Sequence, residues 1–148
     1  ANFEASLLDR LGALPAGEVV SRLRRATALV LPSRFDGWGL VVNEALMAGT
    51  PVVVSDACGA SELLRDGVNG YVFKSEDVED LARALSTVVG LRDSARSQMR
   101  GNAGKVGASL TAREGALYAI DAVQALTAGT APPTPPWVRA LSACESVA

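Results

Sequence analysis

The sequence contains no histidine among its 148 residues. Histidine is the commonest general base near neutral pH and the commonest protein ligand of metals. Any chemistry must therefore use carboxylates, arginine, lysine, backbone dipoles or the substrate itself. The only two cysteines, Cys58 and Cys144, lie far apart and fit neither a disulfide framework nor a zinc-binding pattern. A reducing cytoplasm is the expected location.

Long apolar runs and basic blocks are also absent. No uninterrupted apolar run reaches the ~18 residues of a membrane-spanning helix. The net charge is −2 without a basic cluster, which argues against broad nucleic-acid binding. Residues 1–4 lack the charged and apolar parts of a signal peptide. The hydrophobic fraction of 49% and the charged fraction of 20% are those of an ordinary globular domain.

Short apolar runs alternate with helical patterns along the chain. Strands are expected over about 27–31, 51–55 and 70–73, and in part of 7–14. Helices are expected over about 17–26, 40–48, 60–65, 77–89, 92–103 and 112–126, with Ser75 capping the helix that starts near residue 77. The segment from Thr111 to Glu114 has the form of a capping box. This order predicts the α/β class, with a parallel sheet covered by helices on both faces.

The last part of the chain differs in composition. Residues 130–137 contain four prolines, which cannot continue a helix. We therefore divide the chain into a domain over residues 1–127 and a Pro-rich tail over residues 128–148. Residues 130–137 are expected to be extended or disordered.

The most informative segment joins the first clear strand to the next helix. Two carboxylates, Asp36 and Glu44, stand eight positions apart across a turn that contains Gly37 and Gly39. Glycines allow positive φ angles and close approach of a ligand to the backbone. Ligands of open parallel sheets bind beyond the carboxyl ends of the strands, where this turn is expected to lie. Unpaired N–H groups at the helix start would then attract phosphate.

Glu44 is the sharper indication. The helix around it is apolar nearly all round, which predicts that the helix is buried. A carboxylate in such a helix needs partners, and helical side chains lean toward the N-terminus, so Glu44 is expected to face the turn and accept hydrogen bonds from ribose hydroxyls. Two plainer alternatives remain at this point. Asp36 could be a turn residue bonded to its own backbone, and Glu44 could pair with a buried arginine.

Several spaced motifs resemble the C-terminal domain of glycosyltransferase family 4, the group 1 glycosyltransferases. They are Pro32-Ser33, Asp36-x7-Glu44, the run from Ala45 to Val53, Ser55-Asp56, Gly59-Ala60-Ser61-Glu62, Asp66-Gly67 and Asn69-Gly70. The resemblance covers roughly residues 11–85. It implies the GT-B fold, in which two Rossmann-like domains face each other across a cleft. It also implies that this chain corresponds to most of the C-terminal domain.

The resemblance also implies roles for matching residues. Glu44 matches the second Glu of the family's Glu-x7-Glu motif, which binds the donor ribose. Asp36 matches the first, which contacts the transferred sugar near the reacting centre, although Asp is one methylene shorter than Glu. The backbone that holds the sugar and diphosphate matches Gly37, Trp38, Gly39, Leu40 and Val41, with Trp38 in place of the usual Phe; its ring is expected to pack beneath the loop. The loop beside the base matches Leu11, Gly12 and Ala13.

The implied reaction is a retaining transfer of sugar from a nucleotide-diphosphate sugar, UDP- or GDP-linked, to an acceptor hydroxyl in polysaccharide or glycolipid synthesis. The resemblance implies no metal and no cofactor. Members also carry an N-terminal acceptor domain, and an Arg and a Lys near the start of the C-terminal domain bind the diphosphate. Neither that domain nor those two cations are evident in this sequence, and Arg34 is a poor substitute for the cations. The chain is therefore expected to be a truncated fragment, inactive alone, with any peripheral membrane association residing in the missing half. A non-catalytic nucleotide-sugar-binding module is the alternative, and an epimerase of the same fold a third reading.

Overall fold

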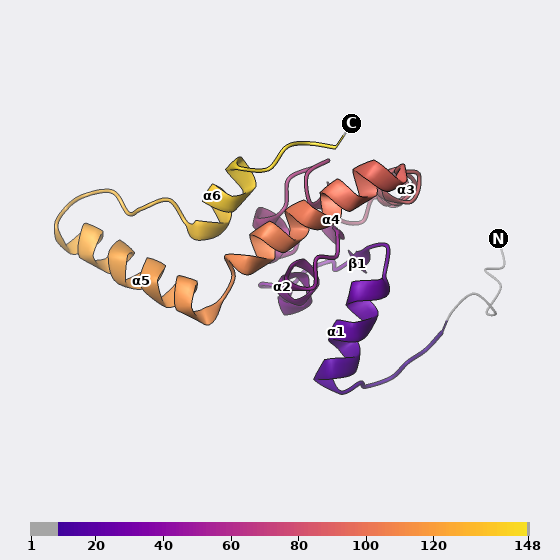
Figure 1. The fold of residues 1–148 in the computed structure, drawn as a ribbon, viewed down its shortest axis with the longest axis horizontal. Helices are drawn as coiled ribbons and strands as arrows, with labels where there is room; N and C mark the ends of the chain where they lie inside the picture. The colour runs from indigo at the N-terminus through magenta and orange to yellow at the C-terminus, as the bar shows by residue number, and fades with distance from the viewer. Residues whose placement is uncertain (1–8, 148) are drawn as a thin grey trace.

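A three-stranded parallel sheet forms the centre of the computed structural model, which describes residues 9–147. Its strands are β1 (Leu29–Leu31), β2 (Val52–Ser55) and β3 (Gly70–Phe73), in the spatial order β1-β2-β3. Val53 in the central strand pairs with Val30 on one side and Tyr71 on the other. Helices cover the sheet (Figure 1), so the predicted α/β class and the Rossmann-like parallel sheet are confirmed.

Alternate residues of β2 supply the two halves of the core. Val52 and Val54 belong to a large apolar cluster with α1 (Ala16–Arg25), α2 (Leu40–Met47), the 3₁₀ helix η2 (Gly59–Leu63) and α6 (Pro136–Ser142). Val53 belongs to a smaller cluster with α3 (Val78–Val89). The long helix α4 (Asp93–Ala108) contributes Met99 to the smaller cluster and Val106 to the larger. β2 is buried throughout, as expected for a parallel strand covered on both faces.

Most boundaries follow the predicted ones, with three differences. The helix-capping side chain of α3 is that of Asp77, which accepts a hydrogen bond from the Asp80 amide at 3.0 Å, and not that of Ser75. Helix α4 extends five residues beyond the predicted end at residue 103, because its buried face continues through Val106 and Gly107. Residues 9–14 contain no strand, whereas residues 7 and 8 of that expected strand lie outside the described residues.

Part of the segment over residues 130–137 is helical, contrary to the prediction. Residues 131–135 belong to no helix or strand, but Pro136 begins α6, where a proline at the first helical position costs no hydrogen bond. The Trp137 ring meets that of Tyr118 edge-on at 5.6 Å, and Leu141 is buried in the larger cluster. Asn102 also holds the tail, donating to the Glu145 carbonyl at 2.9 Å. Apolar side chains after the prolines thus pack the tail against the domain.

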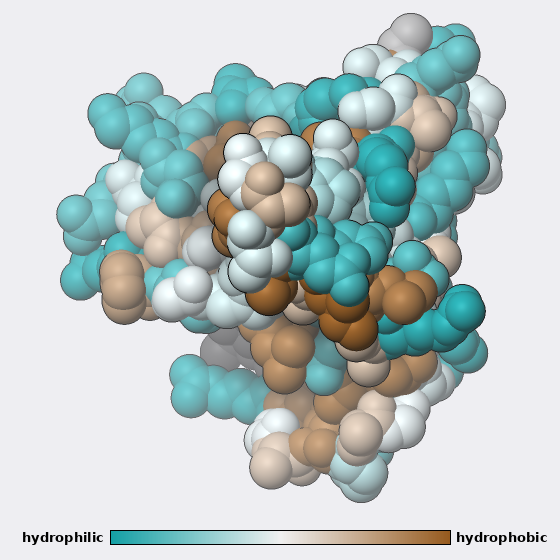
Figure 2. Space-filling view, turned by 90° about the vertical axis from the view of Figure 1, so that its left-hand side faces the viewer, coloured by the Kyte–Doolittle hydropathy of each residue, from teal (hydrophilic) through white to brown (hydrophobic). Residues whose placement is uncertain are grey.

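Helix α5 (Ala112–Thr127) extends away from the layers (Figure 1). Its start is the predicted one, since the Thr111 hydroxyl oxygen accepts a hydrogen bond from the Glu114 amide at 3.2 Å. None of its residues is buried. Seen from the α5 end, Figure 2 shows patches of apolar surface. The exposed large apolar side chains of α5 are Leu117, Ile120, Val123 and Leu126. Among the described helices, none has the length and apolar character needed to cross a membrane.

Candidate functional site

The carboxyl ends of the three strands bring three loops together. The Asp36 amide, after β1, donates to the Ala57 carbonyl, after β2, at 3.1 Å. The Asp56 carboxylate accepts from the Ser75 amide, after β3, at 2.8 Å. An exposed ion pair of 3.2 Å joins Arg34 to Glu76. The turn containing Asp36 therefore lies at the edge of the sheet where open parallel sheets bind ligands.

Asp36 shapes its own turn. One carboxylate oxygen, Oδ1, accepts a hydrogen bond from the Trp38 amide at 3.0 Å. This is the Asx-type turn that was the plainer alternative for Asp36. Within residues 9–147 no hydrogen bond engages the other oxygen, Oδ2. The side chain is half-buried, so the same carboxylate can hold the turn with one oxygen and face a ligand with the other.

A second segment, residues 58–60, holds the turn from behind. The Gly59 amide donates to the Asp36 carbonyl at 3.0 Å, and the Ala60 amide donates to the Trp38 carbonyl at 2.6 Å. A Cβ atom on Gly59 would collide with the Gly37 carbonyl oxygen, so only glycine permits this approach. This contact was not predicted from the sequence, although Gly59 and Ala60 belong to one of the motifs that resemble the family.

Cys58 closes the space beneath the turn. Its thiol donates to the Trp38 carbonyl at 3.0 Å, and the residue is buried. Burial raises the pKa of the Cys58 thiol, the Ala60 backbone N–H partly opposes this, and the nearby negative charge of Asp36 raises it further. The thiol therefore stays neutral and contributes to packing.

The start of α2 presents free donors at the same edge. Gly39 adopts a left-handed conformation with φ of 85° and precedes the first helical residue. A side chain there would meet both Cys58 and Leu31. In the part of the chain that the structure describes, the amides of Leu40 and Val41 donate no hydrogen bond, as is usual in a first helical turn. The Trp38 amide is not free in the same way, because Asp36 already engages it.

Glu44 is exposed, contrary to the prediction that it lies in a buried helix. Helix α2 buries only Val42, Ala45 and Leu46, whereas Leu40 is 66% exposed and Met47 56%. The apolar composition of α2 misled the prediction because one of its sides has no covering element in residues 9–147. Across the same residues Glu44 forms no ion pair, so the alternative in which it pairs with a buried arginine is wrong.

Trp38 lies across the start of α2. Its indole Nε1 donates to the Asn43 side chain at 3.0 Å. The ring borders a cavity of about 160 Å³ that Trp137 from α6 also lines. The indole is therefore anchored against the domain while 39% of the residue stays exposed.

The remaining predicted positions lie elsewhere. Leu11, Gly12 and Ala13 form an exposed segment before α1, and no hydrogen bond within residues 9–147 joins them to the turn. In Figure 1 this segment leaves α1 at the end away from the sheet. Their assignment to a loop beside the base stays a prediction. No three cysteine or acidic side chains of the described residues are placed to hold a metal ion together.

Comparison with known proteins gives one family for most of the chain. The family described as "Glycosyl transferases group 1" matches residues 8–106. Glycogen synthase of Mycobacterium tuberculosis (strain ATCC 25618 / H37Rv) is 40% identical over 95 residues, which cover 64% of this chain and 22% of that protein. The chain thus spans about a fifth of the length of this relative.

Two solved structures share the fold. Sucrose-phosphate synthase from Thermosynechococcus elongatus superposes with a TM-score of 0.70 at 22% identity, covering 85% of this chain and 32% of that one. At that identity the likeness shows the fold alone. Anabaena Alr3699/HepE, solved in complex with UDP-glucose, superposes with a TM-score of 0.56 at 25% identity, covering 62% of this chain and 25% of that one.

Proposed function

Because this chain belongs to the group 1 glycosyl transferases, we propose that it supplies the donor-binding half of an enzyme that transfers a sugar from a nucleotide-diphosphate sugar to an acceptor hydroxyl. One observation carries the proposal. At a single edge of the sheet, a carboxylate with one unengaged oxygen (Asp36), two free amides at a helix start (Leu40 and Val41) and an exposed, unpaired carboxylate (Glu44) occur within nine residues.

These groups match the parts of a nucleotide-diphosphate sugar. Free amides at a helix start bind phosphate through hydrogen bonds and the helix dipole. Carboxylates are acceptor-only groups and suit hydroxyl-rich partners such as ribose and hexose. We assign the diphosphate to the amides of Leu40 and Val41, the ribose to Glu44, and the transferred sugar to the Oδ2 side of Asp36.

The chemical demand is stabilisation of the leaving group. As the bond between sugar and phosphate breaks, negative charge grows on the diphosphate, and donors fixed before the reaction lower the energy of that state. The amides at the start of α2 are fixed in this way, because Gly39 and the bonds from residues 59 and 60 hold the turn. We propose that this chemistry needs no metal and proceeds with retention at the anomeric carbon, Asp36 acting as an orienting group.

A UDP-sugar is the proposed donor. Its support is the HepE neighbour, which was solved with UDP-glucose. The relative named glycogen synthase supports a role in polysaccharide assembly. We place acceptor binding, and any membrane association, in a second domain that faces this edge of the sheet. The exposed side of α2 and the highly exposed Phe35 are available for such a contact.

The test compares Glu44→Ala with Glu79→Ala in a full-length glycosyltransferase that carries this sequence as its donor domain. Glu79 is also an exposed helical glutamate that forms no ion pair within residues 9–147, but it lies in α3. Removing a charged acceptor from a ribose costs about 1.5–3 kcal/mol, or roughly 10–150-fold in donor KM. We expect that rise for Glu44→Ala, with little change for Glu79→Ala, across a panel of UDP-, GDP- and ADP-sugars. An unchanged donor KM in Glu44→Ala would refute the assignment.

A further inference from the structure

We propose that a second, anionic-ligand site lies where α4, α5 and α6 meet, and that it binds the phosphate group of a small phosphorylated metabolite. This inference goes beyond the proposed function and does not depend on it. Most of the site lies after residue 106, where the family match ends. It uses none of the residues assigned to the donor.

The site is an open depression of about 580 Å³. Its lining includes one cation from each of the three helices: Lys105 from α4, Arg113 from α5 and Arg139 from α6. Glu114 is the one carboxylate in that lining. Three helices thus converge to place positive charge in one concave surface, and a cluster of like charges is most stable when an anion occupies it.

Internal ion pairs do not neutralise these cations. Within residues 9–147, neither Lys105 nor Arg139 has an acidic partner within ion-pair distance. Arg139 also borders a smaller cavity that contains Asp121, yet no ion pair forms there. The contact between Arg113 and Glu114 is long, at 3.9 Å, and Arg113 is 83% exposed. Such a contact contributes little and yields readily to a better acceptor.

The start of α5 adds neutral donors to the same depression. Thr111 caps the helix, and its hydroxyl oxygen accepts from the Glu114 amide, which leaves the hydroxyl hydrogen able to donate to a ligand. Among the described residues, the amides of Ala112 and Arg113 donate to no protein group. A helix start with free amides favours an anion. Here it reinforces the three cationic side chains, and the site does not rest on the helix start alone.

The donor set selects the class of anion. Guanidinium groups bind phosphate oxygens in pairs, and a lysine adds a compact point charge. Three cations suit one dianionic phosphomonoester and are too few for a nucleic acid, which the net charge of −2 would also repel. An anionic membrane fits less well. The helix beside the site, α5, carries two acids, Glu114 and Asp121, against one cation, so it is not a basic amphipathic helix.

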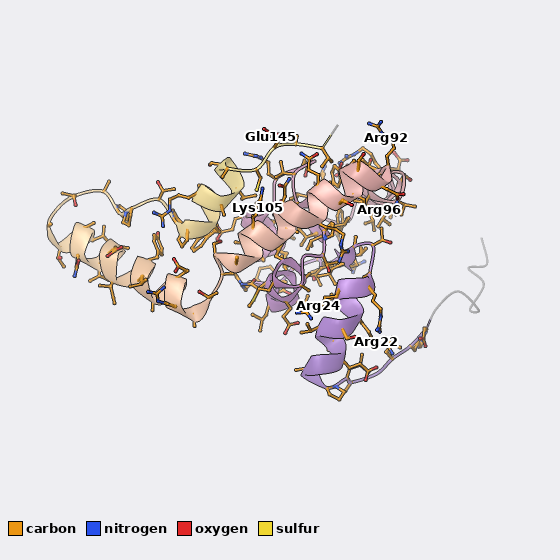
Figure 3. The ribbon with its side chains drawn as sticks, viewed as in Figure 1. Arg22, Arg24, Arg92, Arg96, Lys105 and Glu145 are labelled. Atoms are coloured by element: carbon orange, nitrogen blue, oxygen red, sulfur yellow. The ribbon has the colours of Figure 1, made fainter. Side chains whose placement is uncertain are left out.

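The fluorescence of the two tryptophans can report ligand binding at the proposed site. Trp38 and Trp137 line the neighbouring cavity of about 160 Å³, which shares Ser109 and Thr111 with the proposed site. Binding at Thr111 should therefore change tryptophan fluorescence. Figure 3 shows Lys105 toward the α5 end of α4 and Arg92 at the opposite end, so Arg92 offers an exposed cation outside the site as a control.

The experiment titrates the 148-residue chain with glycerol 3-phosphate and with inorganic phosphate at low salt, by tryptophan fluorescence and calorimetry. We expect saturable binding that Lys105→Gln and Arg139→Gln each weaken about tenfold, while Arg92→Gln binds as the wild type does. Higher salt should weaken binding, and neutral glycerol should not bind. Glu44→Ala should leave the binding of glycerol 3-phosphate unchanged. The result for this anion site is therefore independent of whether the donor assignment is correct.

Each contrary result overturns the proposal. Equal weakening in Arg92→Gln would show nonspecific attraction, and absence of saturable binding would show that no site exists. Vesicles containing phosphatidylserine supply the third arm. If they bind the chain through Lys105 and Arg139 while glycerol 3-phosphate does not compete, the ligand is a lipid headgroup and not a metabolite. Thermal unfolding followed by circular dichroism verifies the fold of each variant; all three side chains are exposed, so the fold should be retained.

Discussion

Replacing Gly59 with alanine tests whether the turn over residues 36–39 depends on close contact between two backbones. The added Cβ would collide with the Gly37 carbonyl oxygen and also press on the carbonyl carbon of Gly37 and the Cα of Trp38. All of these are backbone atoms, so no side-chain rotation relieves the clash. Either the turn or η2 must move.

The expected cost follows from the contacts that would be disturbed. Overpacking typically costs about 1–3 kcal/mol. Displacing the turn also weakens the hydrogen bonds from the amides of Gly59 and Ala60, at about 0.5–1.5 kcal/mol each. Together they lower the free energy of unfolding by about 2–6 kcal/mol. For a chain of 148 residues, at roughly 3 °C per kcal/mol, this lowers Tm by roughly 6–18 °C.

The matched control is Gly101→Ala. Gly101 lies in α4, is exposed, and an added Cβ there meets no other atom within 4 Å. The same chemical change should therefore stabilise the protein by about 0.5–1 kcal/mol, because alanine favours a helix over glycine. Urea unfolding of both variants gives the comparison. A Gly59→Ala variant as stable as the wild type would show that the two backbones do not meet as described.

Three further outcomes follow from other contacts. Asn102→Ala leaves the carbonyls of Val68 and Glu145 without their hydrogen-bond donor and should lower the free energy of unfolding by about 2–5 kcal/mol, measured in urea. The C-terminal residues should also be cleaved earlier by a protease. Unchanged resistance to proteolysis would contradict the docking of the tail. Burial raises the pKa of the Cys58 thiol above 9.0, so the contribution of Cys58 to the free energy of unfolding should be complete below about pH 9 and decrease as the pH rises toward the pKa of the folded state. Iodoacetamide at pH 9 should therefore alkylate Cys58 more slowly in the folded than in the unfolded chain. Equal alkylation rates would refute this prediction. Ile120→Gln, at a side chain 54% exposed on α5, should change stability by less than about 0.5 kcal/mol, and a larger loss would show that this face is covered in solution.

The parts of the fold that were predicted from sequence are those whose signal is local. Strand β3 matches its predicted bounds, because the Asn69-Gly70 turn precedes a short apolar run. The start of α5 matches because Thr111 and Glu114 lie at capping distance along the chain. Gly39 adopts the positive φ angle that the sequence led us to expect of a glycine before the helix. In each case a few consecutive residues determine the outcome.

The failures concern contacts between distant segments. Composition marked residues 130–137 as unable to continue a helix, but it could not show that Pro136 starts a new one whose Trp137 meets Tyr118 from the preceding helix. The contact between Gly59 and the turn over residues 36–39 is equally nonlocal, because it joins two loops that only the parallel pairing of β1 and β2 brings together. Neither contact leaves a periodic pattern in the sequence.

Glu44 remains the proposed ribose ligand even though the prediction that it is buried was wrong. An acid in a buried helix must have partners, and this led us to predict a ligand for Glu44. In the structure the residue is exposed, so burial gives no reason for it to have a hydrogen-bonding partner. The position of Glu44 supports the proposal instead, since Glu44 follows the free amides of Leu40 and Val41 by one helical turn. Leu40 and Met47 of the same helix are also exposed. If a second domain covers that side of α2, it removes water from around Glu44, and its hydrogen bonds to a ribose then strengthen because the competing solvent has been excluded. Exposure in this chain and strong donor binding in the assembled enzyme are therefore compatible, and the measured effect of Glu44→Ala should be larger in the full-length enzyme than in the 148-residue chain.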